Sequence, residues 1–365
     1  MATENFDVTD RRLHVARIEK FRVELLDRHD NLKRDLVEFR GGSWEINTNA
    51  TIKGGGKVEI SRTSDERERA IDFGSDRLKI WYEANGLEWP LGVFLIEAPE
   101  DIYDDQIFTI NTVISLMDKL AILDQQELSE TYSARIGRNV VDEVAYLIRS
   151  TGETAINIEL SSETVRTEMS WEAGTTILKV CNDLLASINY WGLRASGHGV
   201  IFSRPYRKPQ SRPITYVFET GENSVHLAEW SRVFDWYGTP NQVVQVSQGD
   251  DEKPGLIGIA QNNDPDSPYS IPARGRIISM TETGVEATSQ RVIDELAQRR
   301  LLDQSSPVSN ITVDHALMPL EVDDRVQLRT PTHLLDATIT KMSINLQPGS
   351  LVSAEWREIS LVNLT

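Results

Sequence analysis

The sequence contains little of what disulfide-stabilised, membrane-spanning or secreted proteins require. It has one cysteine in 365 residues, Cys181, so no intrachain disulfide can form and folding does not depend on an oxidising compartment. No apolar run approaches the ~20 residues that a membrane-spanning helix needs. The N-terminal segment MATENFDVTDRR lacks the apolar stretch of a signal peptide. We therefore expect a globular chain without a membrane span.

Basic residues are outnumbered by acidic residues. The chain has 38 Lys and Arg against 56 Asp and Glu, which gives a formal net charge of −18. A surface that reads DNA needs clustered Lys and Arg against the phosphates, so this balance argues against sequence-specific nucleic-acid binding. An acidic surface favours solubility, and an acidic pore would also let DNA slide through without adhering.

Recognisable reactive motifs are missing as well. The nucleotide-binding patterns G-x-G-x-x-G and G-x-x-x-x-G-K-[ST] do not occur, nor does the hydrolase pattern G-x-S-x-G. The single cysteine excludes a thiolate zinc site, and no histidine pair has the H-E-x-x-H spacing of a zinc protease. The histidines are His14, His29, His198, His226, His315 and His333. We predict no catalytic residue, no metal and no cofactor, and hence a protein that is not an enzyme.

Four features with potential chemistry have simpler structural interpretations. Cys181 falls on the apolar face of an expected helix, where it fills the core. His198 lies between glycines in an expected turn. Asp323-Asp324 precedes a strand, where acids favour a turn. The segment NNDPDSP at 262–268 resembles an oxygen-rich calcium loop but lacks the acid and glycine spacing of an EF-hand.

Residues 1–125 have the alternation of a β domain. Apolar residues occupy odd positions from Val15 to Leu25, and several short strand-like segments follow. Gly54-Gly55-Gly56 is predicted to form a tight reversal, and Asn85-Gly86 is the strongest hairpin signal. Short strands separated by turn residues indicate a barrel or sandwich.

Residues 126–209 combine helices with strands. Apolar residues from Ile177 to Ile188 recur at helical spacing, and Thr175 or Thr176 can cap that helix. A hairpin with a turn at 196–199 comes next. The segment RPYRKPQSRP at 204–213 has three prolines and is typical of a linker.

Residues 210–365 return to strands. They include an amphipathic helix at about 288–303 and an irregular, Pro- and Gly-rich excursion at 249–276. In the segment from Leu335 to Leu346, apolar residues change from odd to even positions between Ile339 and Met342. Such a change within one strand predicts a bulge or a corner.

Two stretches together resemble a known family. They are GTTILKVCNDLLASINYWGLRASGHGVIFSRPYRKPQSRPITYVF at 174–218 and the C-terminal segments VDHALMPLEVDDRVQL and DATITKMSINLQPGSLVSAEWREI. The segments PARGR, WPLGVFLIEAPE and GGSWEINTNATIKGGG fit the same pattern. The chain resembles siphophage minor tail proteins of the baseplate-hub family, as found in phages of actinobacteria, over about residues 13–360.

The resemblance implies a mainly β fold with a smaller α/β part, in which two tail-tube-like β-barrel domains flank a helix-containing insert. It implies a homotrimeric ring at the distal end of the virion tail, joining the sixfold tube to the threefold tip. Expected partners are the distal tail protein ring, the tape measure protein and receptor-binding tip proteins, with phage DNA passing through the lumen. Because the chain ends at Thr365, just after the second β region, we expect a hub without a lysin module.

Two alternatives remain open: a carbohydrate-binding or cell-wall-degrading tail protein, and a distal tail adaptor ring. Long irregular loops in compact domains often carry function, so the excursion is the candidate partner-contact loop. Its candidate contact residues are Asp250, Asp251, Asn262, Asn263, Asp264, Asp266 and Tyr269.

Overall fold

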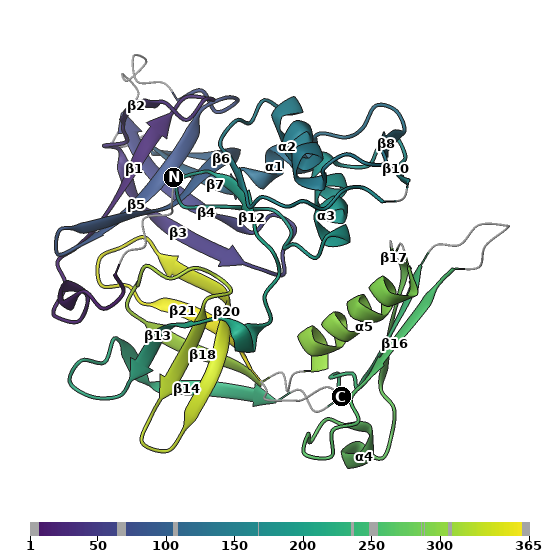
Figure 1. Ribbon diagram of the computed structural model, residues 1–365. Coiled ribbons are helices and arrows are strands. Elements are labelled where there is room, and N and C mark those ends of the chain that lie inside the picture. Colours follow the sequence, from purple (N-terminus) through teal and green to yellow (C-terminus); the bar gives the residue numbers. More distant parts are fainter. Residues whose placement is uncertain are drawn as a thin grey trace.

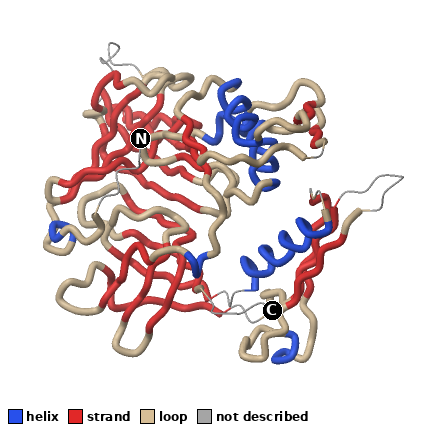
Figure 2. Tube along the Cα trace, viewed as in Figure 1, coloured by secondary structure: helices blue, strands red, loops and turns tan. Residues whose placement is uncertain are grey.

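The computed structural model describes residues 7–63, 71–104, 109–166, 168–234, 237–247, 255–285, 287, 289–305 and 309–359. Strands dominate it, and the helices gather beside the main sheet (Figure 1, Figure 2). The predicted mainly β fold with a smaller helical part is therefore confirmed.

Both β regions contribute to one thirteen-stranded sheet. Its path runs β14-β18-β21-β20-β3-β4-β7-β6-β5-β1-β2, and β19 joins β13 to β20. The first region supplies β1 (Glu19–Leu26), β2 (Leu32–Asp35), β3 (Phe39–Asn47), β4 (Gly54–Thr63), β5 (Arg77–Ala84), β6 (Leu87–Asp104) and β7 (Thr109–Asp118). The second supplies β13 (Ile214–Glu219), β14 (His226–Phe234), β18 (Ser309–His315), β19 (Arg325–Arg329), β20 (Leu334–Asn345) and β21 (Val352–Glu358).

The prediction of two barrels was wrong, because the strands form a continuous sheet that does not close within the described residues. The joint is β20, which pairs with β19 along its first half and with β3 along its second half. The predicted bulge is confirmed: the register against β21 shifts between Ile339 and Lys341. The bulge lets Ile339 and Met342 both point into the core, although they lie at opposite parities.

The predicted reversal at Gly54-Gly55-Gly56 was also wrong, since these glycines belong to β4. Their role is close approach to β3. A Cβ atom at Gly56 would lie 2.1 Å from the Ser43 carbonyl oxygen, and one at Gly42 would lie 2.0 Å from that of Lys57. Asn85-Gly86 does form the predicted hairpin turn, with φ of 50° and 78°.

One apolar core underlies both β regions. Trp44 and Tyr82 from the first region belong to the same buried cluster as Phe218 and Trp356 from the second. The Phe218 and Trp356 ring centroids are 4.8 Å apart. Large aromatic rings dominate core energetics, so this shared cluster makes the two regions one packing unit. Val15, predicted to begin the inward alternation, is instead exposed.

The α/β unit, residues 120–203, packs beside the first β region (Figure 1). Its elements are α1 (Leu120–Gln125), β8 (Tyr132–Ala134), α2 (Val140–Ser150), β9 (Ile156–Ile158), β10 (Met169–Trp171), α3 (Ile177–Ser187), β11 (Arg194–Ala195) and β12 (Ile201–Ser203). Thr176 caps α3, as predicted, by accepting a hydrogen bond from the Lys179 amide at 3.2 Å. The domain boundaries at 125 and 209 stay predictions.

The excursion and the amphipathic helix form a small unit, residues 237–305, beside the main sheet (Figure 1). It contains β15 (Gln242–Ser247), β16 (Ile257–Gln261), α4 (Ile271–Arg274), β17 (Ser279–Val285) and α5 (Gln290–Ser305). The excursion was predicted to be irregular, but its described part contains β16 and α4. Ile293, Ala297 and Leu301 of α5 are buried against the three-stranded sheet. Short 3-10 helices occur at η1 (Arg11–Leu13) and η3 (Pro209–Ser211).

A closed ring of four charges joins the α/β unit to the first β region. The Lys119 ammonium lies 2.7 Å from Asp30 and 2.5 Å from Glu153. The Arg77 guanidinium lies 2.8 Å from the other oxygen of Asp30 and 2.6 Å from the other oxygen of Glu153. The Lys119 side chain is fully buried. Each charge therefore depends on its partners for compensation.

Lys119→Met should lower the free energy of unfolding by about 3–5 kcal/mol, because the buried Glu153 carboxylate and the partly exposed Asp30 carboxylate would then share one cation. Lys57→Met is the matched control: Lys57 is exposed on β4, and its loss should change stability by less than about 0.5 kcal/mol. Chemical denaturation of both variants measures the difference. Equal changes in the free energy of unfolding for the two variants would show that the ring stabilises the fold no more than a surface charge does.

Candidate interaction surfaces

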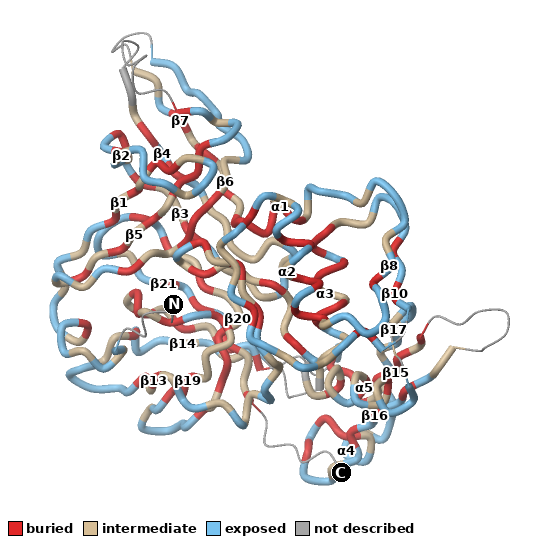
Figure 3. The backbone as a smooth tube through the Cα atoms, turned by 45° about the horizontal axis from the view of Figure 1, so that its top comes forward, coloured by how far each residue is buried: buried red, intermediate tan, exposed pale blue. Residues whose placement is uncertain are grey.

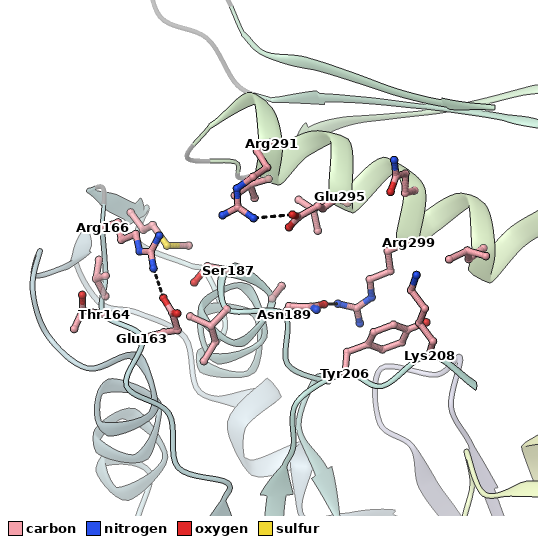
Figure 4. A pocket seen from close by; sticks show the side chains of 18 residues that line it. Glu163, Thr164, Arg166, Ser187, Asn189, Tyr206, Lys208, Arg291, Glu295 and Arg299 are labelled. Atoms are coloured by element: carbon pink, nitrogen blue, oxygen red, sulfur yellow. Dashed lines mark hydrogen bonds and ion pairs between the residues drawn. The ribbon is translucent and has the colours of Figure 1, made fainter. Parts of the chain in front are cut away.

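The first candidate surface is a cleft of about 470 Å³ between α5 and the α/β unit, here called the α5 cleft (Figure 4). Its apolar lining residues are Val165, Met169, Ile188, Val292, Leu296 and Leu302. Its charged lining residues are Glu163, Arg166, Lys208, Arg291, Glu295 and Arg299. Four cations against two carboxylates give the cleft a formal charge of +2, opposite in sign to the whole chain.

Helix α5 serves two surfaces at once. Ile293, Ala297 and Leu301 repeat every fourth residue and face the small sheet. Val292 precedes Ile293 in the sequence, and Leu296 precedes Ala297. Both are half-buried and line the cleft. The helical spacing of these five residues predicts a single apolar stripe, and the structure divides that stripe between a core and a cleft.

Arg299 bridges the cleft from α5 to the α/β unit. Its Nη1 donates a hydrogen bond to Asn189 Oδ1 at 2.7 Å, and its guanidinium lies 3.9 Å from the Tyr206 ring centroid. Figure 4 shows this contact and two ion pairs near it. Arg166–Glu163 measures 2.5 Å and Arg291–Glu295 measures 2.6 Å. All four side chains of those two pairs are exposed. Breaking either pair to form a contact with another partner would therefore cost little free energy.

The second surface, the central cleft, has a volume of about 510 Å³ where both β regions meet the β11–β12 hairpin. Trp44, Trp89 and Met318 are among its apolar lining residues. Lys53 donates to the carbonyl oxygens of Thr48 and Ala50 at 2.8 Å each, and burial lowers the pKa of its ammonium group.

Asp323 and Asp324 occupy the predicted turn before β19 beside this cleft. Asp323 forms an ion pair with Arg194 of the hairpin and has a φ of 65°. Asp324 accepts a hydrogen bond from the Glu321 amide at 2.9 Å. Burial raises the pKa of the Asp324 carboxyl to about 6, more than that hydrogen bond lowers it. The turn therefore fastens the second β region to the α/β unit, in line with the structural interpretation.

The candidate contact loop bonds mainly to itself. Asn262 is buried; its amide group donates to Ser267 Oγ at 3.0 Å, and its side-chain oxygen accepts from the Asp264 amide. Tyr269 is buried with the Arg274 guanidinium 5.0 Å from its ring centroid. Asn263 and Asp266 are exposed. Asp250 and Asp251 lie outside the described residues, and the loop's contact role stays a prediction.

Other singled-out residues have the expected surroundings. His198 is exposed in the turn between β11 and β12. Cys181 is buried on α3, and burial raises the pKa of its thiol. Across the described ranges, no three His, Cys, Asp or Glu side chains gather closely enough to hold a metal ion. None of the helices in those ranges has the length and apolarity to cross a bilayer.

Solved structures of phage tail proteins share this fold. The tail protein from Neisseria meningitidis MC58 matches 94% of this chain and 98% of its own, with a TM-score of 0.67 and 10% identity. The 43 kDa tail protein of prophage MuSo2 from Shewanella oneidensis matches 94% and 100%, with a TM-score of 0.66 and 11% identity. Prophage tail protein gp18 from Listeria monocytogenes matches 93% and 95%, with a TM-score of 0.56 and 10% identity.

No family model matches the sequence, and no curated protein matches it by sequence. The structural matches establish that the chain has the fold of phage tail proteins across nearly its whole length.

The pH dependence of stability should report the buried Asp324 carboxyl. Its folded pKa of about 6 lies above the ordinary 3.8, so its contribution to the free energy of unfolding is greatest below pH 4 and falls as pH rises to 6. Asp324→Asn removes that dependence. Wild type should therefore gain stability relative to the variant as pH falls from 7 to 4.5, measured as urea midpoints.

Asp27→Asn is the control, because folding lowers the pKa of Asp27 whereas it raises the pKa of Asp324. Hydrogen bonds from Asn31 lower the pKa of the exposed Asp27 carboxyl to about 2, so its stabilising contribution is lost only as pH falls below about 4. Its difference from wild type should stay constant between pH 4.5 and 7. A constant difference for Asp324→Asn as well would contradict the assignment.

Arg299→Ala should loosen the small unit from the α/β unit, because it removes the hydrogen bond to Asn189 and the stacking on Tyr206. Amide hydrogen exchange around residues 189 and 206 should accelerate by about tenfold or more. Arg291→Ala, which removes only an exposed pair on the same helix, is the control and should leave this exchange unchanged.

Proposed function

We propose that the chain is a structural, non-enzymatic subunit of a phage tail tip, with the role of a baseplate hub. The observation that carries the proposal is the full-length match in fold to two tail proteins, at TM-scores of 0.67 and 0.66 with at least 98% of each covered. A match of both β regions and the units between them supports the role of a whole subunit rather than of one grafted domain.

The architecture suits assembly into a ring. The path of the sheet ends at β14 and β2, and the described strands do not close it. Edge strands carry unpaired backbone groups that another chain can bind, so these edges are suited to neighbouring subunits. The shared core of the two β regions would keep each wall segment rigid.

We propose a homotrimer at the distal end of the tail. In it, each copy presents two β regions and so adapts a sixfold tube to a threefold tip. Its neighbours would be the distal tail protein ring, the tape measure protein and receptor-binding tip proteins. Three copies carry three times −18, a formal charge of −54. Acidic residues facing the lumen would repel phosphate and let the genome pass without adhering.

The mass in solution tests the trimer. Light scattering at several concentrations should give 123.6 kDa, three chains of 41.2 kDa. A stable hexamer would favour the distal adaptor ring instead. A chain that remains at 41.2 kDa throughout, and hydrolyses cell wall, would contradict the structural role.

A further inference from the structure

One end of β6 projects from the sheet as an acidic arm, defined here as residues 97–104. Strand β5 pairs with β6 only as far as Leu95, so beyond that point β7 is the one described strand that pairs with β6. Every residue of the arm is exposed. It carries four carboxylates and two outward apolar side chains, Ile102 and Tyr103, which are 51% and 66% exposed. Figure 3 shows the end of β4, β6 and β7 standing clear of the molecule.

Exposed apolar residues on an open strand edge normally invite association, and acids beside them restrict the partner to one of positive charge. The arm therefore needs a surface that combines apolar lining with cations.

The α5 cleft has both properties. Residues 184–218 contain no Asp or Glu, and they place Arg204, Arg207 and Lys208 in exposed positions. Lys208 lines the cleft together with Arg299, while Val292 and Leu296 add half-buried apolar surface to its lining. The volume of about 470 Å³ is in the range that admits a few side chains.

We propose that the acidic arm of one copy docks into the α5 cleft of a neighbouring copy. Ile102 and Tyr103 would pack on the apolar lining, and Glu100 would pair with a rim cation such as Lys208. The Arg166–Glu163 and Arg291–Glu295 pairs are exposed, so rearranging them would cost little. The inference rests on the proposed ring of identical copies.

The geometry requires two copies. The arm stands on the far side of the first β region from α5 (Figure 3), so it points away from its own cleft. Two different surfaces of one chain then meet head to tail, which is the type of contact that closes rings. The contact would also fix the direction in which successive subunits follow one another.

Three variants, one of the arm and two of the cleft, test the contact in the full-length protein. Ile102→Asp with Tyr103→Asp removes the arm's apolar side chains and keeps the cleft. Leu296→Asp introduces a charge into the apolar lining of the cleft and leaves the arm unchanged. Lys208→Glu with Arg291→Glu is a second cleft variant that changes only exposed residues and so preserves folding. Leu334→Asp, at an exposed leucine of the second β region, is the control.

Light scattering should show that the wild type and the control associate, while each arm or cleft variant alone associates at least about tenfold more weakly. A 1:1 mixture of an arm variant and a cleft variant has one intact pair of surfaces. It should form a species of 82.4 kDa, two chains of 41.2 kDa, that grows no further.

The other outcomes separate this inference from the proposed function. A trimer that survives in every variant would overturn the arm-to-cleft contact and leave the ring intact. Loss of association in the cleft variants alone would mean that the cleft binds a different segment, which also overturns it. A wild-type chain that remains monomeric at all concentrations would overturn the contact and the ring together.

Discussion

The placement of the α/β unit on the sheet depends on four charges, of which Arg77, Lys119 and Glu153 are buried and Asp30 is partly exposed. Asp30, Arg77, Lys119 and Glu153 come from the β1–β2 turn, the start of β5, the end of β7 and the loop after α2. Each cation contacts both carboxylates, so the ring is neutral and every member is compensated. The ring therefore also fixes the position of the α/β unit. Any displacement of this unit would leave a charge without its partner and away from water.

The rest of the architecture extends from that fixed joint. The α/β unit holds the β11–β12 hairpin, whose Arg194 pairs with Asp323 in front of β19. It also supplies Asn189, to which Arg299 of α5 is bonded. The second β region is joined to the first by β20 and by the shared aromatic core. A rigid wall of this kind suits the structural role proposed for the chain.

Local features of this fold could be predicted from the sequence, since their physics is local. The Thr176 cap, the Asn85-Gly86 turn and the bulge after Ile339 each follow from a few adjacent residues. The prediction of two barrels was wrong because the strand pairing depends on residues that lie far apart in the chain. The pairing that makes one sheet brings Thr48 Oγ1 to the Thr340 carbonyl, 292 positions away, and no periodicity reveals it. The β4 glycines were predicted to form a turn because the sequence alone does not show how closely β3 approaches them.

The same distinction holds for the candidate surfaces. The excursion was noticed for its composition, yet its described residues Asn262 and Tyr269 are buried within the loop's own packing. The α5 cleft was missed because Val292 and Leu296 share one apolar stripe with residues of the small unit's core. The acid-free run at 184–218 was the available signal, since it stands out in a chain with 56 acids.

The most direct test of the account is the position of this chain in assembled particles. Electron microscopy of phage particles in which the chain carries a compact label should show the label at the distal end of the tail, around the threefold axis. Label along the tail shaft, on the capsid, or absent from purified particles would contradict the assignment to the tail tip.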